Sequence, residues 1–462
     1  MRKKFAFMMF FIMLSTIVLS VSCAQAETEI FDMDLTSEYS IDLTGLTFTW
    51  GSNWATASWN PTPGFSADGD RMLQRYNDLE KEYGCEFDVI QWEDSSGQIY
   101  QRVVAGIPTP DWIDTHSNGG GIQLFNSNII VALEDIPTID LSSDKYGTEA
   151  FRRYGVYEGK SYGFTPYLWD YGPEFAGICA FNTEMISSFG CVSPYELKEK
   201  GEWNWENFRQ LLLDIQVAEA GVNDNFSPLM IREIWETVKG LWFSNDLQIV
   251  ETTSNNTTLG VNNSHGYYAV EYLKGLFDDE LCSIGEARNF SLDEYCAIQF
   301  NQANLVSSYM NRTTSSGYAT EADFAYGVMP YPYGPNGNPD SHSGYVYNGR
   351  RLNYVIAFSG NEIEDIGTVL EYVYAPLDNS VGWKEYLAEN VFWDKRDSVN
   401  YNYMIDNIYY DYSTELNDVS GNFSNAITKA VRGKATVSEA FNSVLSQINQ
   451  EINENIVPFL GD

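Results

Sequence analysis

Three tryptophans lie close together near the start of the chain, in a segment that reads TWGSNWATASWNPTPG from Thr49 to Gly64. Its Gly, Ser, Asn, Thr and Pro residues are typical of a loop and not of a helix or a central strand. Loops normally lie at the surface, where an indole ring is costly to expose unless it contacts something. We expect Trp50, at the end of a strand, to pack in the core, and Trp54, with Trp59 as a weaker candidate, to contact a bound molecule.

Carboxylates are the most abundant reactive groups, because the chain has 64 Asp and Glu residues against 27 Lys and Arg. Glycoside hydrolysis uses a pair of carboxylates at a fixed separation, but in so acidic a chain any apparent pair is chance-level evidence. The sequence has no GxSxG, HExxH or P-loop motif, and no glycine-rich dinucleotide motif with its acidic residue. It therefore favours a non-catalytic protein without a cofactor.

Metal binding has little support, because the chain has three histidines and no CxxC pair. Cys179 with Cys191, and Cys282 with Cys296, could form disulfides in an exported protein. Buried free thiols are the favoured interpretation, since an odd cysteine is left over.

The net charge of −37 argues against a nucleic-acid ligand, because no surplus of Lys and Arg exists to replace phosphate counterions. It also argues against electrostatic binding to an anionic membrane surface. We interpret the charge as a solvated, self-repelling surface.

The N-terminus has the features of a secretory signal: Arg2, Lys3 and Lys4, an apolar run over 5–21, and then small residues. The sequence SVSC favours cleavage before Cys23, which would become a lipidated first residue, although Leu19 lies one place too early for the usual lipobox. Ordinary cleavage after AQA, before Glu27, is the alternative. We expect a signal peptide over 1–22, a tether over 23–44, and a protein held by its lipid at the outer face of the cell membrane or, in the alternative, secreted or periplasmic.

Strands and helices are expected to alternate along the rest of the chain, which indicates a mostly parallel sheet with crossover helices. The first series has strands at 45–50, 85–92 and 111–115, with helices at 71–83 and 98–105. The Gly- and Pro-rich stretch 159–175 interrupts the alternation and indicates a crossing between lobes. The second series has strands at 175–182, 304–310, 323–335 and 352–358, and helices at 204–215, 230–242, 266–277, 363–374 and 433–452, the last with a capping box of Thr436 and Glu439.

Taken in order, several phrases of the sequence resemble the extracellular solute-binding proteins of carbohydrate ABC transporters (family 1, maltodextrin-binding-like). The phrases are IPTPDWID, GKSYGFTPY, FAGICAFNTEMISSFG, GEWNWENFRQLL, FAYGVMPYPYGPNG and RGKATVSEAFNSVLSQI. The resemblance runs from about residue 45 to 455 and departs at CAFN, where the family usually has Tyr before Asn. It implies an α/β, two-lobe, periplasmic-binding-protein-like (type II) fold with discontinuous lobes joined by hinge strands. Lobe 1 would comprise 45–170 and 306–358, and lobe 2 would comprise 171–305 and 359–462.

The resemblance also implies a carbohydrate ligand. A sugar ring has an apolar face of C–H groups, which suits aromatic rings, and a rim of hydroxyls, which suits carboxylates, amides and Arg. Positions that match the family's contact regions are Trp54, Asp114, His116, Trp169, Glu174, Glu233, Trp235, Asn311, Arg312, Tyr345 and Asn348. Packing in the core is an equal alternative for Trp235, and an ordinary loop histidine is one for His116.

The sequence thus predicts a substrate-binding lipoprotein that captures a carbohydrate between two lobes and passes it to the permease subunits of an ABC importer. We expect it to act as a monomer, without metal or cofactor. Two alternatives stay open: a secreted carbohydrate-active enzyme, and the same fold binding a peptide or another small solute.

Overall fold

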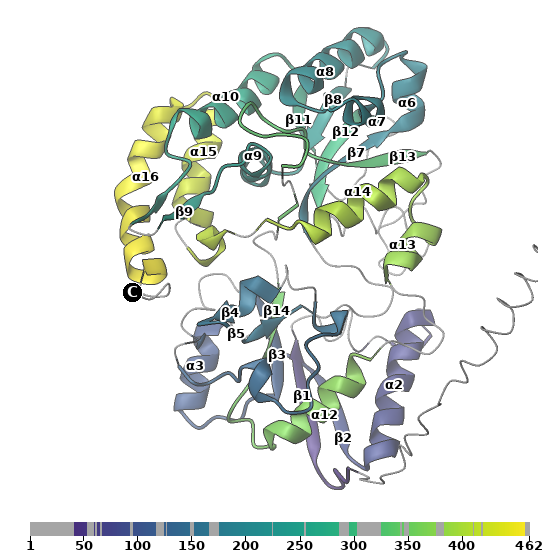
Figure 1. Ribbon diagram of the computed structural model, residues 1–462, viewed down its shortest axis with the longest axis vertical. Helices are drawn as coiled ribbons and strands as arrows, with labels where there is room; N and C mark the ends of the chain where they lie inside the picture. Colours follow the sequence, from purple (N-terminus) through teal and green to yellow (C-terminus); the bar gives the residue numbers. More distant parts are fainter. Residues whose placement is uncertain are drawn as a thin grey trace, which may run out of the picture. The chain divides into compact units, whose positions relative to one another are not determined.

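The computed structural model of the 462-residue chain describes residues 41–52, 60, 62–64, 67–92, 96–116, 124–125, 127–147, 152–165, 175–223, 225–253, 256–285, 295–302, 325–341, 344–345, 351–375, 383–409, 411–416 and 419–457. Among these residues, no helix is long and apolar enough to cross a membrane. They form two lobes, each built around its own five-stranded sheet (Figure 1).

Lobe 1 contains the described residues of 43–165 and 351–375. Its sheet has the order β2 (Glu86–Gln91), β1 (Thr47–Ser52), β3 (Trp112–His116), β14 (Arg351–Val355) and β6 (Gly163–Phe164). β1 pairs in parallel with β2 and β3, whereas β14 runs antiparallel to β3 and β6. Smaller elements are the hairpin of β4 (Val156–Tyr157) and β5 (Lys160–Ser161), and the 3₁₀ turns η2 (Leu133–Asp135), η3 (Asp144–Tyr146) and η4 (Arg153–Gly155).

Helices cover both faces of this sheet. α2 (Ala67–Tyr83) and α12 (Ile363–Val373) contact each other and pack on the face that carries Trp50 and Trp112, whereas α3 (Ser96–Val104) packs on the face that carries Ile113. Because neighbouring strand residues point to opposite faces, Trp112 and Ile113 fall into different layers.

Lobe 2 contains the described residues of 175–345 and 383–457. Its sheet has the order β11 (Cys282–Ile284), β8 (Ser227–Ile231), β12 (Cys296–Gln302), β7 (Ala176–Asn182) and β13 (Tyr326–Pro330). β8 pairs in parallel with β11 and β12, and β7 runs antiparallel to β12 and β13. A separate hairpin is formed by β9 (Val250–Thr253) and β10 (Asn256–Leu259).

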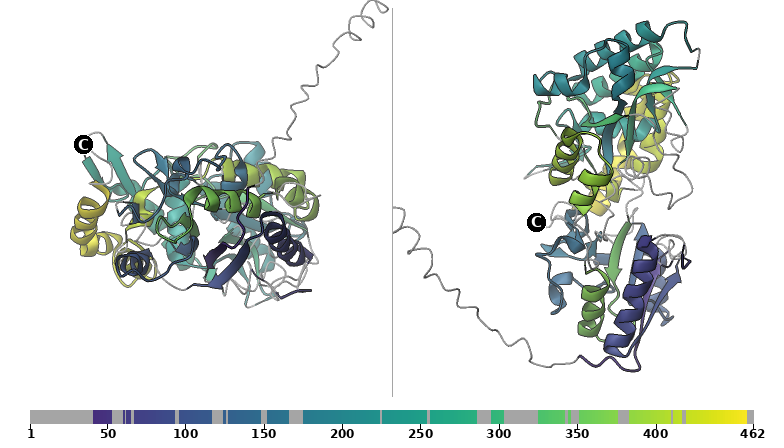
Figure 2. Two further views of the ribbon diagram at one scale, coloured as in Figure 1. Left: turned by 90° about the horizontal axis from the view of Figure 1, so that it is seen from below. Right: turned by 90° about the vertical axis from the view of Figure 1, so that its right-hand side faces the viewer.

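One face of the second sheet is covered by α8 (Trp205–Glu219), α9 (Ile234–Phe243) and α10 (Ser264–Asp278), joined by the C-terminal helices α15 (Ser424–Val431) and α16 (Val437–Glu451). α10, α15 and α16 lie side by side in all views (Figures 1 and 2). The other face is covered by α13 (Trp383–Asn390) and α14 (Lys395–Asp406). The remaining elements are α6 (Thr183–Ser188), α7 (Pro194–Glu199), the 3₁₀ turn η5 (Tyr412–Glu415) and the π-helical turns η6 (Val419–Phe423) and η7 (Ile452–Ile456).

The two sheets share one plan. In each sheet, three parallel strands lie beside an antiparallel strand, β14 in lobe 1 and β7 in lobe 2. The chain reaches this strand directly from the other lobe, β7 after residues 166–174 and β14 after residues 346–350. A third crossing, over 376–382, returns the chain to lobe 2. Both lobes are therefore discontinuous in sequence, as expected.

The lobe boundaries differ from the expected ones in two places. β13 is hydrogen-bonded to β7 along its whole length, so residues 325–345 belong to lobe 2 and not to lobe 1. α12 buries Ile366, Val369 and Leu370 in the core of lobe 1, so this lobe extends to residue 375 instead of ending at 358. The helix expected over 230–242 begins only at Ile234, because residues up to Ile231 belong to β8.

A local sequence signal explains where α16 begins. The capping box at the start of α16 is present, with Thr436 Oγ1 accepting from the Glu439 backbone N–H and the Glu439 carboxylate accepting from the Thr436 N–H. All five described cysteines are free, and four of them are buried as expected, whereas Cys191 is partly exposed. β8 separates Cys282 from Cys296, because the first pairs with Leu229 and the second with Ser227.

Candidate functional site

In lobe 1, buried polar side chains gather where β1 and β3 end. Ser52 is the last residue of β1, and its hydroxyl donates a hydrogen bond of 2.8 Å to Asp114 Oδ2 on β3. Asn353 of β14 is the residue directly opposite Asp114, and all three side chains are at most 3% exposed. This cluster lies at the carboxyl edge of the parallel strands, the edge at which ligands collect in open α/β sheets. It directly precedes the segment that carries Trp54.

An aromatic wall holds this polar cluster in place. Trp50 is fully buried, as predicted, and stacks on Trp112 with 6.1 Å between ring centroids. The indole N–H of Trp112 donates to the Tyr374 hydroxyl at 3.0 Å, and that hydroxyl donates to Asn353 Oδ1 at 3.5 Å. Burial raises the pKa of Tyr374 well above its usual value, so this phenol keeps its proton. The chain of bonds fixes the direction of the Asn353 amide.

Asp111 secures the entry of β3. Its carboxylate accepts from the Thr49 backbone N–H at 2.7 Å and from Asn361 Nδ2 at 3.0 Å. Burial raises its pKa, while these hydrogen bonds favour the charged form. Asp111 therefore ties β1 and β3 to the segment after β14 and holds the sheet that presents Asp114.

In lobe 2, the matching position follows β8. The strand ends at Ile231, Arg232 and Glu233 are exposed, and α9 begins at Ile234. The Glu233 carboxylate makes no capping hydrogen bond to the helix. An exposed carboxylate at this position can accept hydrogen bonds from the hydroxyls of a bound molecule.

Trp235, in the first turn of α9, is a core residue. Its ring is 5% exposed and makes edge-to-face contacts with Trp242 at 5.8 Å and Phe423 at 5.5 Å. A ring so enclosed offers no open face for stacking, which supports the packing interpretation of Trp235. Its buried indole N–H has no hydrogen-bond partner among the described residues.

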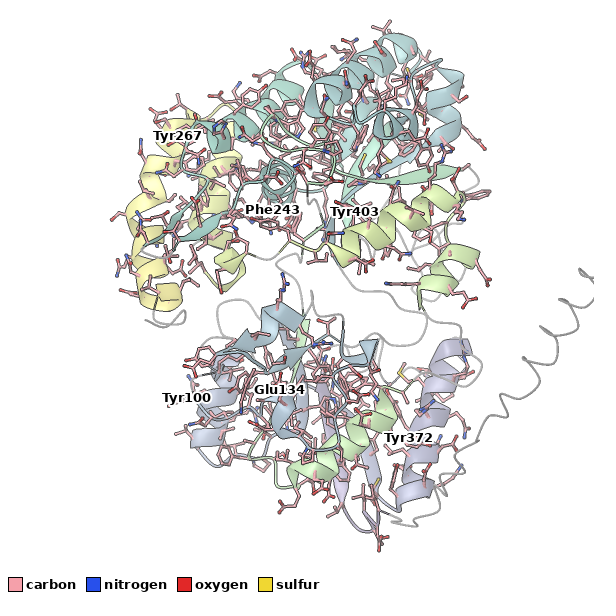
Figure 3. All side chains as sticks on the ribbon, in the orientation of Figure 1. Tyr100, Glu134, Phe243, Tyr267, Tyr372 and Tyr403 are labelled. Carbon is pink, nitrogen blue, oxygen red and sulfur yellow. The ribbon has the colours of Figure 1, made fainter. Side chains whose placement is uncertain are left out.

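Tyr345 is also buried, at 1% exposure, and is hydrogen-bonded to α9. Its hydroxyl lies 2.6 Å from the Glu236 carbonyl oxygen and 3.2 Å from Glu236 Oε2. Burial raises the pKa of Tyr345, and the neighbouring Glu236 carboxylate raises it further, so the hydroxyl acts as a donor. Phe243, labelled in Figure 3, packs edge-to-face on the Tyr345 ring at 5.1 Å. Within the described residues, Tyr345 is thus a positioning residue of α9.

A buried ion pair completes this support. Lys239 Nζ lies 2.9 Å from Glu236 Oε1, and the two side chains are 3% and 12% exposed. The same ammonium group lies 5.1 Å from the centroid of the Tyr345 ring and 5.7 Å from that of Trp235. α9 is buried along its whole length, so the pair neutralises two charges inside an apolar environment.

The other expected contact residues cannot be placed. Outside the described residues lie Trp54, Trp169, Glu174, Asn311, Arg312 and Asn348, as well as the predicted lipidation site Cys23. His116 is described only by its backbone, as the last residue of β3. Among the described residues, no group of three His, Cys, Asp or Glu side chains could hold a metal ion.

Sequence reasoning missed four polar residues of these edges: Ser52, Asn353, Glu236 and Lys239. A signal existed for the last two, since an acid and a base three residues apart interrupt an otherwise apolar helix. Ser52 and Asn353 carry no such signal, because only the pairing of β1, β3 and β14 brings them to Asp114.

No protein-family model and no curated protein sequence matches the chain. Solved structures do match over most of its length. UgpB from Mycobacterium tuberculosis, in complex with glycerophosphocholine, is 14% identical, with a TM-score of 0.60 over 89% of this chain and 99% of that chain. The GacH receptor of Streptomyces glaucescens, solved unliganded and with acarbose, is 15% identical, with a TM-score of 0.59 over 89% and 100%. The cyclic alpha-maltosyl-1,6-maltose binding protein of Arthrobacter globiformis is 14% identical, with a TM-score of 0.60 over 88% and 99%.

These neighbours match the fold of this chain over nearly their whole length, at TM-scores of 0.59 to 0.60. The chain therefore has the two-lobe, type II periplasmic-binding-protein fold, and its resemblance to extracellular solute-binding proteins is confirmed at the level of fold.

Proposed function

We propose that this chain is the substrate-binding component of an ABC importer, which captures a carbohydrate, most simply an oligosaccharide, between its two lobes and delivers it to a membrane permease. The observation that carries the proposal is the Ser52–Asp114–Asn353 cluster at the carboxyl edge of lobe 1, next to the segment of Trp54, in a fold shared with sugar-binding proteins. Asp114, 3% exposed in this structure, would accept from a sugar hydroxyl once the ligand is bound, while Ser52 and Asn353 hold it in place. Trp54 would supply an aromatic face for the apolar side of the sugar ring.

Lobe 2 would contribute Glu233 from the start of α9. Trp169, Glu174, His116, Asn311, Arg312 and Asn348 complete the proposed contacts on the strength of the sequence resemblance. Trp235 and Tyr345 would act indirectly, because Trp235 is a core residue of α9 and Tyr345 is buried against Glu236 of the same helix. Their role is to hold Glu233 in place.

The physical mechanism is capture by closure. Ligand bound to one lobe gains further contacts when the second lobe meets it, and these contacts shift the population toward the closed form. Micromolar affinity corresponds to about −8 kcal/mol. A stacked ring and several charge-assisted hydrogen bonds can supply that amount after the cost of association. The protein would carry out no bond-breaking step on the ligand.

Localisation forms part of the proposal. We expect lipidation at Cys23 to hold the protein at the outer face of the membrane, close to its permease. Replacement Cys23→Ser should release the mature protein into the soluble extracellular or periplasmic fraction. Retention of the variant in the membrane fraction would contradict lipid anchoring and would leave solute binding untouched.

The decisive experiment is a thermal-shift screen of the purified mature protein against oligosaccharides, short peptides, polyols and glycerophosphodiesters. We expect an oligosaccharide to raise the melting temperature, and chromatography to recover that sugar unchanged. Release of new reducing ends would establish an enzyme instead. A shift in melting temperature with peptides alone, or with a glycerophosphodiester alone, would be compatible with the fold but would refute a carbohydrate ligand.

The sugar identified in this way then tests Trp54. We expect Trp54→Ala to weaken its binding by about 1–3 kcal/mol, the usual cost of truncating an aromatic anchor. Tyr100→Ala is the matched control, because Tyr100 is an aromatic residue of lobe 1 with 46% exposure on α3. Equal affinities of the two variants would assign Trp54 to a purely structural role.

A further inference from the structure

Lobe 2 contains a cavity that the proposed function does not use. Its volume is about 470 Å³, within the usual size range of small-molecule sites. It lies between the end of β7, α6, the start of α7, the start of β13 and the residues that precede α14. Figure 1 shows these elements together at one end of the second sheet.

This cavity opens at the opposite edge of the sheet from Glu233. β7 runs antiparallel to β12, so its carboxyl end at Phe181 pairs with Ile298, near the start of β12. Glu233, in contrast, follows the carboxyl end of β8, which is parallel to β12. A strand of this length spans roughly 20 Å. The cavity is therefore a separate place on lobe 2.

Aromatic side chains form much of its wall. Trp393 lines the cavity and is 50% exposed, which is unusual for an indole ring in a folded protein. The buried rings of Phe181, Tyr195 and Tyr326 lie beneath. Trp393 directly precedes Asp394, the N-cap of α14, and the capping box there fixes the backbone that carries the indole.

Hydroxyl groups stand beside these rings. Ser187 and Ser193 line the cavity, and neither hydroxyl makes a hydrogen bond within the described part of the chain. The Thr183 hydroxyl donates to the Ala325 carbonyl at 2.9 Å and retains its acceptor capacity. The wall therefore offers both donors and acceptors to a polar ligand.

Charges around the cavity are already compensated. The Arg396 guanidinium makes two hydrogen bonds to Asp394, of 3.0 and 2.8 Å, and covers the Tyr195 ring at 3.9 Å. These bonds hold the pKa of Asp394 below its usual value. Glu196 pairs with Lys200 at 2.6 Å. Because each charged residue described in the cavity wall has an oppositely charged partner, the site suits a neutral ligand.

We propose that this cavity is a second binding site for a neutral sugar ring, which stacks on Trp393 and exchanges hydrogen bonds with Ser187 and Ser193. A half-exposed indole, on the same wall as two hydroxyls that bond to no other described residue, matches the apolar face and the hydroxyl rim of such a ring. Because the site lies within one lobe, it would bind its ligand in the open and the closed protein alike.

The test is a titration of the full mature protein, labelled with fluorotryptophan, with neutral monosaccharides and disaccharides up to the millimolar range, followed by fluorine NMR. Trp393→Phe assigns the Trp393 resonance. We expect this resonance to shift on titration in the native protein and in Trp54→Ala alike. A Trp393 resonance that no neutral sugar moves, or that moves only when the interlobe site fills, would overturn the proposal. The first result leaves the proposed function open, whereas the second would support ligand binding between the lobes.

A blocking variant supplies the second arm. Ser187→Tyr places a ring in the cavity from α6 and should weaken the Trp393 titration at least about tenfold, a change of about 1.4 kcal/mol. Ser188→Tyr is the matched control, because Ser188 is the next residue of α6, is exposed like Ser187 and does not line the cavity. Equal titrations of the two variants would also overturn the proposal.

Discussion

The buried ion pair of α9 permits a sharp prediction about lobe 2. Lys239→Met keeps the length and most of the volume of the side chain and removes its charge. The Glu236 carboxylate, 12% exposed, then loses the ammonium group that lies 2.9 Å from Oε1. Within the described part of the chain, the Tyr345 hydroxyl, 3.2 Å from Oε2, remains as a donor to this carboxylate. We therefore expect the variant to fold less stably and to bind ligand more weakly through a displaced Glu233.

The magnitude follows from the geometry. Two unit charges about 4 Å apart attract each other by about 4 kcal/mol at an effective dielectric constant of 20. Measured losses on removal of one partner from a buried pair are about 3–5 kcal/mol. Because whole proteins are stable by only about 5–15 kcal/mol, Lys239→Met should use up a large part of the free energy of unfolding. The double variant Glu236→Leu with Lys239→Met should lose about 2–3 kcal/mol less than the sum of the two single variants.

Urea unfolding, followed by tryptophan fluorescence and far-ultraviolet circular dichroism, measures these free energies. The control is Lys200→Met on α7, whose partner Glu196 lies at 2.6 Å but whose side chains are about half exposed, at 53% and 51%. An exposed pair of this kind contributes about 0.5 kcal/mol. If Lys239→Met costs no more than Lys200→Met, or if the double variant is additive, the α9 pair does not support the helix as argued.

Three further predictions concern other buried polar groups. Burial raises the pKa of Asp397 from 3.8 to about 6, so its contribution to stability is present below pH 4 and lost as the pH rises through 6. The free energy of unfolding of the native protein relative to Asp397→Asn should therefore fall by about 2 kcal/mol between pH 4 and 7 in urea titrations, and an increase would refute this sign. Tyr345→Phe leaves the Glu236 acceptors without their hydroxyl donor and should cost about 1–3 kcal/mol in the same assay, with no change expected if the bond is incidental. Asp114→Asn can keep the hydrogen bond from Ser52 but replaces the carboxylate by a neutral amide. Calorimetry should therefore show about tenfold weaker sugar binding, while the urea midpoint stays unchanged. Unchanged affinity would exclude Asp114 from the site.

Elements with a clear boundary signal could be predicted from the sequence. The helix expected over 71–83 ends at Tyr83, before Gly84, whose φ of +71° suits glycine. The α16 capping box was read directly from Thr436 and Glu439. In each case the signal is local, because a cap or a left-handed residue acts on its immediate neighbours.

Two central strands of lobe 2 escaped prediction for a physical reason. β8 (Ser227–Ile231) and β12 (Cys296–Gln302) lie between other strands of the sheet. β8 is almost fully buried and reads SPLMI, with no alternation of apolar and polar residues. Such runs resemble a buried helix in sequence. The end of β8 was accordingly assigned to the helix that follows it.

The lobe boundaries failed because strand pairing is a long-range property. Nothing in residues 323–335 reveals that β13 pairs with β7, about 150 positions earlier in the chain. The shared plan of the two sheets was equally invisible, because it consists of strand order and direction and not of repeated residues. The site was affected in the same way: Asp114 was identified from its neighbours in sequence, whereas Asn353 reaches it only through the pairing of β14 with β3.

A buried tyrosine performs the same task at the candidate edge of each lobe. In lobe 1, Tyr374 links Trp112 to Asn353 and stands two residues before the crossing that begins at 376. In lobe 2, Tyr345 donates to Glu236 and directly precedes the crossing over 346–350.

The Tyr345 backbone also exchanges two hydrogen bonds, of 2.8 and 3.0 Å, with Ala176, which follows the first crossing. The polar edge of each lobe is thus hydrogen-bonded to a tyrosine next to a segment that connects the lobes, and not only to its own sheet. The Tyr345 hydroxyl contacts α9, and the Tyr345 backbone is bonded to Ala176. A ligand contact that moves α9 can therefore shift the backbone at the two positions where the chain enters and leaves lobe 2. For that reason Tyr345→Phe should alter ligand affinity beyond its cost in stability, although the Tyr345 side chain itself is enclosed in the core.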